Sequence, residues 1–260
     1  MVIDFCHGKQ NNLLADNTQV KQNVYMNLLA QLKTNLESIE EKLSYVFANK
    51  EFLILSFTHR SFINEYRNGS LPHNERLEFL GDSVLGLVIA DYLYHRLPGH
   101  PEGLLSQLRS RLVDASSCAH YLQKLRLSEH ILLGKGEVTS EGRTKTSILA
   151  DVFEALLGAI YLDGGLGATK SFLLCHFETE FEAAIGSPPR NYKAELQDFS
   201  QKQFQKIPIY KVVDETGPDH CKIFHVMVFM NEEEGGVGMG PSKKEAEQKA
   251  AFDALSKRNL

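Results

Sequence analysis

Cysteine is scarce in this chain. Only 4 of the 260 residues are cysteine, and they stand far apart, at Cys6, Cys118, Cys175 and Cys221. No two of them form a CxxC pair, and none lies near a histidine at a spacing typical of zinc sites. The pattern excludes a disulfide framework and a cysteine-based zinc site, and it predicts free thiols.

Long hydrophobic runs are also missing. The longest, such as residues 85–90, fall far short of the roughly 18 apolar residues that a membrane-spanning helix needs. Residues 1–17 lack the basic start and the apolar block of a secretory signal. With 43% hydrophobic and 23% charged residues, the composition is that of a folded globular protein. We therefore expect no membrane association and a cytoplasmic location.

The chain has no excess of basic residues either. Its formal net charge is -5, whereas proteins that bind nucleic acids usually carry a basic excess. A local basic patch can nevertheless coexist with an acidic cleft in the same protein. The placement of charge, rather than its sum, must therefore decide whether this chain binds nucleic acid.

Acidic residues recur at helical spacing in residues 74–93. Glu75, Glu78 and Asp82 are three and four residues apart, which places them along one stripe of a helix. The residues between them follow the spacing of a buried stripe: Leu77, Leu80, Val84, Leu85 and Val88. Three clustered carboxylates repel one another, and a bound cation would relieve that repulsion. A solvated acidic face is the alternative interpretation.

A second acidic pair argues against that alternative. Asp151 and Glu154 lie three residues apart on the otherwise apolar helix predicted at residues 147–163, where buried carboxylates need a partner. Glu102 begins another predicted helix, and the helix dipole alone is enough to favour an acid there. Gly81 and Gly86 each cost roughly 1 kcal/mol in a helix interior, so we interpret them as points of close helix approach.

The pattern changes after Ser187-Pro188-Pro189, which reads as a linker. The residues before it predict helices and no clear strand, whereas those after it predict a helix, three strands and a final helix. The third of these strands is rich in glycine, which permits tight packing against a neighbour. The predicted divisions are an N-terminal extension at 1–33, a helical domain at 34–186, a linker at 187–191 and an α+β domain at 192–260.

Several blocks of sequence resemble a known family. The block NERLEFLGDSVL at 74–85 resembles the signature of the ribonuclease III family, and THRSF, PEGLLSQLRSRLV and SILADVFEALLGAIYLDGG stand in that family's order. KAELQDFSQ, TGPDHCKIF and SKKEAEQKAA resemble a double-stranded-RNA-binding domain. The resemblance covers residues 36–260. It implies an all-α ribonuclease III endonuclease domain followed by a small α+β (α-β-β-β-α) double-stranded-RNA-binding domain, as in the bacterial enzyme.

The resemblance also implies roles for the acids. Four of them are expected to surround magnesium, with manganese as a substitute and no organic cofactor: Glu78, Asp82, Asp151 and Glu154. Magnesium prefers carboxylate and water oxygens, and the absence of a Glu-x-x-His motif disfavours a di-iron site. Loss of Asp82 or Glu154 is expected to damage turnover most, while Glu75 and Glu102 support the site. His59 and Ser61 of THRSF are expected to form hydrogen bonds in the core.

For the binding domain, the resemblance implies three regions that contact RNA. Duplex RNA is recognised by shape, through its minor groove and its phosphates. Residues 190–260 hold 11 basic and 11 acidic residues, so the prediction depends on placement. The expected contacts are Glu195 and Gln197 on the first helix, the loop at 217–220 with His220, and Lys243, Lys244 and Lys249 at the start of the last helix.

The family resemblance leads to a specific functional hypothesis. It implies a Mg2+-dependent endoribonuclease that cuts both strands of double-stranded RNA, leaves 5′-phosphate and 3′-hydroxyl ends, and processes ribosomal RNA precursors and some messenger and transfer RNAs. A homodimer through the helical domain is implied as well. The alternatives are a double-stranded-RNA-binding protein with an inactive nuclease fold and a helical metalloprotein unrelated to RNA.

Overall fold

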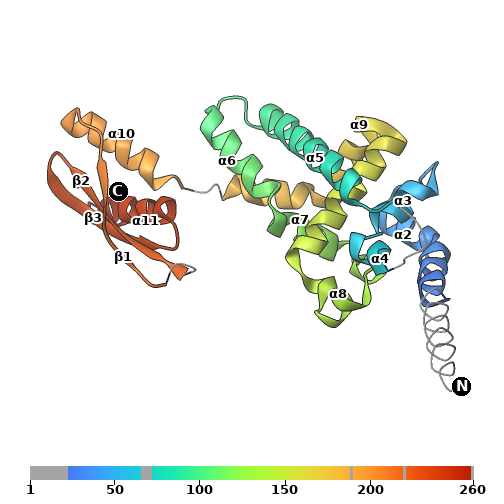
Figure 1. Cartoon of the computed structure of the whole chain (residues 1–260). Helices are drawn as coiled ribbons and strands as arrows, with labels where there is room; N and C mark the ends of the chain where they lie inside the picture. The colour runs from blue at the N-terminus through green and yellow to red at the C-terminus, as the bar shows by residue number, and fades with distance from the viewer. Residues whose placement is uncertain (1–22, 66–71, 188–189, 219–220, 259–260) are drawn as a thin grey trace, which may run out of the picture. The chain divides into compact units, whose positions relative to one another are not determined.

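The computed structural model describes residues 23–65, 72–187, 190–218 and 221–258. The chain divides into two compact units, residues 1–188 and 189–260 (Figure 1), and this division falls inside the predicted linker. Each unit is described separately below. In the described parts of the chain, no helix is both long enough and apolar enough to cross a membrane.

The first unit is built from helices. They are, in chain order, α2 (Leu36–Leu43), α3 (Lys50–Ser56), α4 (Arg60–Glu65), α5 (Glu75–Arg96), α6 (Glu102–Leu112), α7 (Ala115–Lys124), η1 (Ser128–His130), α8 (Lys135–Thr139), η2 (Gly142–Thr144) and α9 (Thr146–Gly186). The only β-type pairing among its described residues is an isolated bridge between Thr58 and Leu132. This confirms the prediction of a helical domain.

Helices α5 and α9 form the centre of this unit. Their apolar residues line up at helical spacing and are fully buried, as at Leu85 and Ile89 of α5 and Leu156 and Ile160 of α9. Burial of each such side chain contributes about 1.5–3 kcal/mol. Helix α9 bends at Gly165, whose φ of 75° lies in the left-handed region that glycine adopts readily. Asp163-Gly164-Gly165, a sequence that predicts a turn at the end of the helix, is thus a kink between two helical segments.

Part of the N-terminal extension belongs to the same core, which differs from the boundary expected at residue 34. Residues 23–34 form a helix, and its Tyr25 and Leu32 are buried in the main hydrophobic cluster. The Tyr25 ring packs edge-on against Phe62, with 4.7 Å between the ring centroids. Its hydroxyl donates a hydrogen bond to the Glu65 carboxylate at the end of α4. Residues 1–22 lie outside the described part of the chain.

The second unit has the predicted α-β-β-β-α order. It consists of α10 (Tyr192–Phe204), β1 (Ile209–Thr216), β2 (Ile223–Met230), β3 (Glu233–Gly240) and α11 (Lys243–Ser256), with antiparallel strands in the order β1-β2-β3. The glycines of β3 let α11 pack tightly: a Cβ on Gly238 would lie 2.2 Å from the Ala250 nitrogen. Small residues on both sides of this contact therefore allow the helix to lie close to the sheet.

Candidate active site and nucleic-acid interface

The acidic stripe on α5 forms as its spacing predicts. Asn74 precedes the first turn and is itself fully buried. Glu78 is partly buried, whereas Glu75 and Asp82 are exposed. The buried Leu77 and Gly81 lie between these acids and anchor the helix to the core. The stripe therefore lies at the edge of the core, where carboxylates are partly removed from water.

Helix α9 brings the second acidic pair against this stripe. A Cβ built on Gly81 would lie 1.7 Å from the carbonyl oxygen of Glu154, so only glycine permits the observed approach of the two backbones. The interpretation of Gly81 as a point of close approach is confirmed. It is wrong for Gly86, because nothing lies within 4 Å of the corresponding Cβ position.

The electrostatics of the site show that the acids of the two helices affect one another. Burial, followed by the negative charges of Asp82 and Glu78, raises the pKa of Glu154 to about 7. Burial and then the charge of Asp151 raise the pKa of Glu78 to about 6. The pKa of Asp151 is raised by burial and by the charge of Glu75. We use the term acidic seam for Glu75, Glu78 and Asp82 of α5 together with Asp151 and Glu154 of α9.

The chemistry of the acidic seam fits a hard divalent cation. Its donors are all carboxylate oxygens, and Mg2+ commonly binds one or two carboxylates while it keeps several waters and takes substrate phosphates. Among the described residues, no three His, Cys, Asp or Glu side chains already form a group that could hold a metal ion. The seam thus supplies negative charge and oxygen donors without a closed set of protein ligands.

A pocket of about 460 Å³ opens beside the seam. Cations balance part of its charge: Arg60 Nη1 lies 3.1 Å from Glu75 Oε1, and Lys145 Nζ lies 2.7 Å from Glu137 Oε2. The acids that line it are Glu75, Glu78, Glu137 and Asp151. The sequence analysis did not identify Arg60 or Glu137 as site residues. Arg60 stands within the THRSF block and could have been found there.

Residues 134–146, which supply Glu137 and Lys145, hold three glycines and few apolar residues, a pattern that predicts an exposed and locally basic loop. The segment instead contains the short helix α8 and the turn η2. Lys145 directly precedes α9, which explains how a residue of this basic segment reaches the pocket. Periodicity could not reveal α8, because its five residues make little more than one helical turn.

His59 and Ser61 form the hydrogen bonds expected of them. His59 Nδ1 lies 2.7 Å from Ser61 Oγ, which also accepts a hydrogen bond from the Gly134 amide at 2.9 Å. These bonds tie α4 to the start of α8. His59 also lines the pocket beside the seam, and burial lowers its pKa below the usual range. Its imidazole is therefore neutral at pH 7 and adds no positive charge to the pocket.

Glu102 is not brought to the acidic seam within a single chain. It is the first residue of α6 and is exposed, and its Oε1 accepts a hydrogen bond from Ser106 Oγ at 2.6 Å. It follows the C-terminal end of α5, whereas the seam acids of α5 lie near its N-terminal end, and its charge is not among those that shift the pKa values of Glu78, Asp151 and Glu154. Sequence spacing alone could not have shown this, because α6 follows α5 only after a turn at residues 97–101.

One cysteine lies under the seam. Cys118 on α7 is fully buried, and burial, followed by the negative charge of Glu154, raises the pKa of its thiol. The thiol is therefore uncharged at neutral pH. Free thiols are confirmed at Cys118, Cys175 and Cys221, and Cys6 lies outside the described residues.

The second unit presents most of its predicted RNA-contact residues on its surface. Gln197 on α10 is exposed, and Glu195 is paired with Arg190 at 2.5 Å. Lys243 and Lys244 begin α11 and are exposed, with Lys243 Nζ 5.5 Å from the centroid of the Phe224 ring. His220 lies outside the described residues.

Lys249 lies apart from the other two lysines of α11. It follows Lys243 by six residues, which places it about 120° around the helix. Its ammonium pairs with Glu245 at 2.8 Å, and it lines a hollow beside His225 and Met239 of the sheet. The structure therefore does not group Lys249 with Lys243 and Lys244.

Comparison with known proteins agrees with this architecture. Residues 49–179 match the family model described as Ribonuclease-III-like, and residues 192–258 match the double-stranded RNA binding motif. Ribonuclease 3 of Protochlamydia amoebophila is 56% identical over 237 residues, which cover 91% of this chain and 98% of the relative. Ribonuclease 3 of Chlamydia muridarum is 42% identical over 226 residues, which cover 87% and 97% of the two chains.

A solved structure shares the helical fold. The nuclease domain of ribonuclease III from Campylobacter jejuni superposes with a TM-score of 0.53 at 41% identity, covering 57% of this chain and 99% of that domain. The study of that domain describes flexibility in a region involved in dimer formation.

A helical nuclease domain with an acidic seam, followed by a double-stranded-RNA-binding domain, defines a double-strand-specific endoribonuclease. The chain belongs to the ribonuclease III family. Enzymes of this family are generally metal-dependent.

Proposed function

We propose that this enzyme uses Mg2+, or Mn2+ as a substitute, to hydrolyse phosphodiester bonds in both strands of duplex RNA. The products carry 5′-phosphate and 3′-hydroxyl ends. The observation that carries the proposal is the contact between Gly81 and the Glu154 backbone, which joins the acids of α5 and α9 in one seam.

Four residues would hold the metal: Glu78, Asp82, Asp151 and Glu154. A bound Mg2+ supplies an activated water and neutralises charge that develops on the phosphate. Burial and then the charges of neighbouring carboxylates raise the pKa values of Glu78 and Glu154, and a bound cation would relieve the repulsion among these carboxylates. Asp82 is exposed beside them and is placed to face substrate. Glu75 supports the seam through its ion pair with Arg60.

The proposed assembly is a homodimer through the helical domain. Large apolar side chains remain exposed on α5, with Phe79 at 78%, Leu87 at 55% and Tyr94 at 70%. Helical geometry places them along one stripe, directly beside the stripe of Glu75 and Asp82. A second copy packed on this stripe would bury it and bring a second seam alongside the first. Glu102 does not reach the acidic seam of its own chain, so it would support the site only in such a dimer.

The RNA-binding domain would hold the duplex through its exposed polar residues. We assign phosphate contacts to Lys243 and Lys244, since the N-terminus of α11 also favours anions. Glu195 and Gln197 on α10 would meet a minor groove, and His220 with its loop would meet the next. Lys249 remains a proposed contact, although its position on α11 separates it from the other lysines.

We further propose that the enzyme acts in the cytoplasm on precursors of ribosomal RNA and on some messenger and transfer RNAs. Duplex regions occur in all three classes, and recognition by shape does not restrict the enzyme to one sequence. A binding protein with an inactive nuclease fold is the competing function. All six acids of the family motif are present, which favours an active enzyme.

Cleavage of an end-labelled RNA duplex tests the proposal. The wild type should cut both strands only when Mg2+ or Mn2+ is present, and Glu154→Gln should bind the duplex without cutting it. Glu51→Gln is the matched control, because Glu51 is exposed on α3 and is absent from the pocket lining. A wild type that binds the duplex but never cuts it in either metal would establish the binding-protein function instead.

A further inference from the structure

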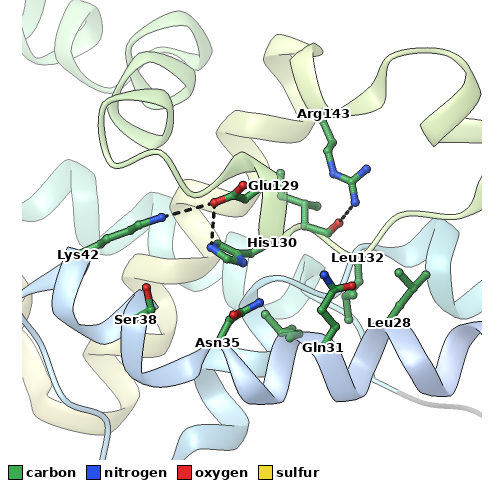
Figure 2. Close-up of a pocket in the computed structure, with 11 residues that line it drawn as sticks. Leu28, Gln31, Asn35, Ser38, Lys42, Glu129, His130, Leu132 and Arg143 are labelled. Carbon is green, nitrogen blue, oxygen red and sulfur yellow. Dashed lines mark hydrogen bonds and ion pairs between the residues drawn. The ribbon is translucent and has the colours of Figure 1, made fainter.

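A second cavity lies away from the acidic seam. It measures about 400 Å³ and opens between the N-terminal helices and the segment that carries η1 (Figure 2). Gln31, Asn35 and Ser38 rise toward it from the helices at residues 23–34 and α2, and Glu129, His130 and Arg143 line it from the other side. None of its lining residues belongs to the pocket beside the seam.

The charges of this cavity favour an anion. Lys42 and Arg143 line it, against a single acid, Glu129. Glu129 lies at the exposed edge of the cavity and already has two partners. Its Oε1 lies 3.5 Å from Lys42 Nζ and 3.5 Å from His130 Nε2. Arg143 is held in place by a hydrogen bond from its Nη2 to the Ile131 carbonyl at 3.1 Å. The cavity therefore carries one positive charge more than it has acids to pair.

Two nitrogen atoms in the cavity wall are buried and form no hydrogen bond with any described residue. They are Arg143 Nε and His130 Nε2, which lies 3.5 Å from Glu129 Oε1. An unpaired buried donor costs about 1–3 kcal/mol, so such atoms in a native protein call for an explanation. A small side-chain shift on ligand entry would give both atoms an acceptor.

Neutral polar groups complete the lining. The side chains of Gln31, Asn35 and Ser38 make no hydrogen bond to described residues, although all three line the cavity. Leu28 and Leu32 add apolar surface. The volume lies within the range of about 300–1,000 Å³ that is usual for small-molecule sites. Several donors around one cavity suit a group with several acceptor oxygens, and phosphate has more of these than a carboxylate.

We propose that this cavity binds a small phosphorylated ligand of nucleoside monophosphate size, whose phosphate is attracted by the positive charge of Lys42 and Arg143 and whose polar body lies against Gln31 and Asn35. Much of the site, including Lys42, comes from residues before position 49, where the match to the nuclease family model begins. The N-terminal helices thus form one wall of the site, and residues of the nuclease match such as His130 and Arg143 form the other; none of them lines the pocket beside the acidic seam.

Calorimetric titration of the full chain with inorganic phosphate and with adenosine 5′-monophosphate tests the site. Both probes should bind, and Lys42→Gln should weaken each by at least about tenfold, the loss of one charge-assisted hydrogen bond. Asn35→Leu, which leaves every ion pair intact, should weaken the nucleotide more than inorganic phosphate. Lys33→Gln is the matched control for Lys42→Gln, because Lys33 is exposed on the preceding helix, at residues 23–34, but does not line the cavity.

Three results would overturn the proposal. The first is the absence of saturable binding of either probe by the wild type at about 5 mM ligand. The second is unchanged nucleotide binding in both Lys42→Gln and Asn35→Leu variants that retain the wild-type thermal midpoint. The third is a loss of duplex RNA affinity in Lys42→Gln without a loss of nucleotide affinity, which would make the cavity part of the duplex-binding surface.

Discussion

Gly158 of α9 packs directly on the backbone of Leu77 in α5: a Cβ at Gly158 would lie 2.2 Å from the Leu77 carbonyl oxygen. Gly81 makes the reciprocal contact from α5 to α9. The two glycines set the distance between the helices that carry the acidic seam. The geometry of the site therefore depends on residues that have no side chain of their own.

Gly158→Ala should destabilise the nuclease domain. Its methyl group must push α5 and α9 apart, and overpacking of this kind costs about 1–3 kcal/mol. Urea unfolding followed by circular dichroism measures the loss. Gly86→Ala is the control: nothing lies within 4 Å of its Cβ position, so it should stabilise the helix by about 0.5–1 kcal/mol. Equal effects of the two substitutions would contradict the packing argument.

The pH dependence of stability should reveal Glu154. Its pKa is about 7 in the folded protein and near 4.3 when unfolded, so between these values the folded state binds the extra proton. Its contribution to stability therefore falls as pH rises from about 4.3 to about 7. In chelator-treated protein, Glu154→Gln should gain stability relative to wild type when the pH is raised from 5 to 8. A constant difference between the two proteins would refute the raised pKa.

Magnesium should raise the thermal midpoint of the protein, and more at pH 8 than at pH 6. At the lower pH, Glu154 is largely protonated and Glu78 about half protonated, and metal ligands must be deprotonated. Differential scanning fluorimetry with and without Mg2+ measures the shift. Asp82→Asn should reduce it, whereas Asp198→Asn in the RNA-binding domain should not. If Mg2+ raised the thermal midpoint by the same amount at both pH values, the acidic seam would be excluded as the binding site.

Phe79→Ser should weaken dimer formation. Phe79 is the most exposed residue of the proposed contact stripe, at 78%, and buried aromatic anchors of interfaces typically contribute at least about 2 kcal/mol. Sedimentation velocity over a range of protein concentrations should show more monomer than in the wild type. Val46→Ser removes an equally exposed apolar residue, 75% exposed in the same unit but away from α5, and should leave the assembly unchanged.

Lys243→Gln and Lys244→Gln should each weaken binding of duplex RNA irrespective of its sequence. Removal of one phosphate contact lowers the salt dependence of binding by about one unit of slope. Filter binding at several salt concentrations measures this slope. Lys257→Gln lies near the other end of the same helix, paired with Asp253, and should change neither affinity nor slope. Lys249→Gln should have a smaller effect, because it faces another direction.

The acids of the seam were predictable because helical period and motif spacing fix which residues share a face. Glu75, Glu78 and Asp82 needed only the 3.6-residue turn to be grouped. Helical periodicity could not predict that these acids lie close to Glu154, because α9 begins about 70 residues after α5. The family resemblance supplied the pairing. Gly81 and Gly86 gave the same local hint of close approach, which was right for Gly81 and wrong for Gly86.

Other parts of the fold escaped prediction for physical reasons. Residues 23–34 stand in a polar stretch, but Tyr25, Leu28, Leu29 and Leu32 follow the spacing of one helix face, and their contacts with the main cluster make this helix part of the core. Glu137 depends on the short helix α8, whose stability comes from tertiary contacts such as the hydrogen bond from the Gly136 amide to Glu65 Oε1 at 3.3 Å. Local patterns do not record such long-range contacts.

The contacts of Tyr25 define where a stand-alone nuclease fragment should begin. The Tyr25 hydroxyl donates a hydrogen bond to Glu65 Oε2, and Glu65 Oε1 accepts one from the Gly136 amide, next to Glu137 of the pocket beside the acidic seam. A fragment that starts at Leu36 would lack the hydrogen bond from Tyr25 to Glu65 and would expose Phe62. The segment that carries Glu137 would then be held less firmly. An expressed domain that retains residues 23–34 should give the more soluble and more active nuclease, even though these residues precede the match to the family model.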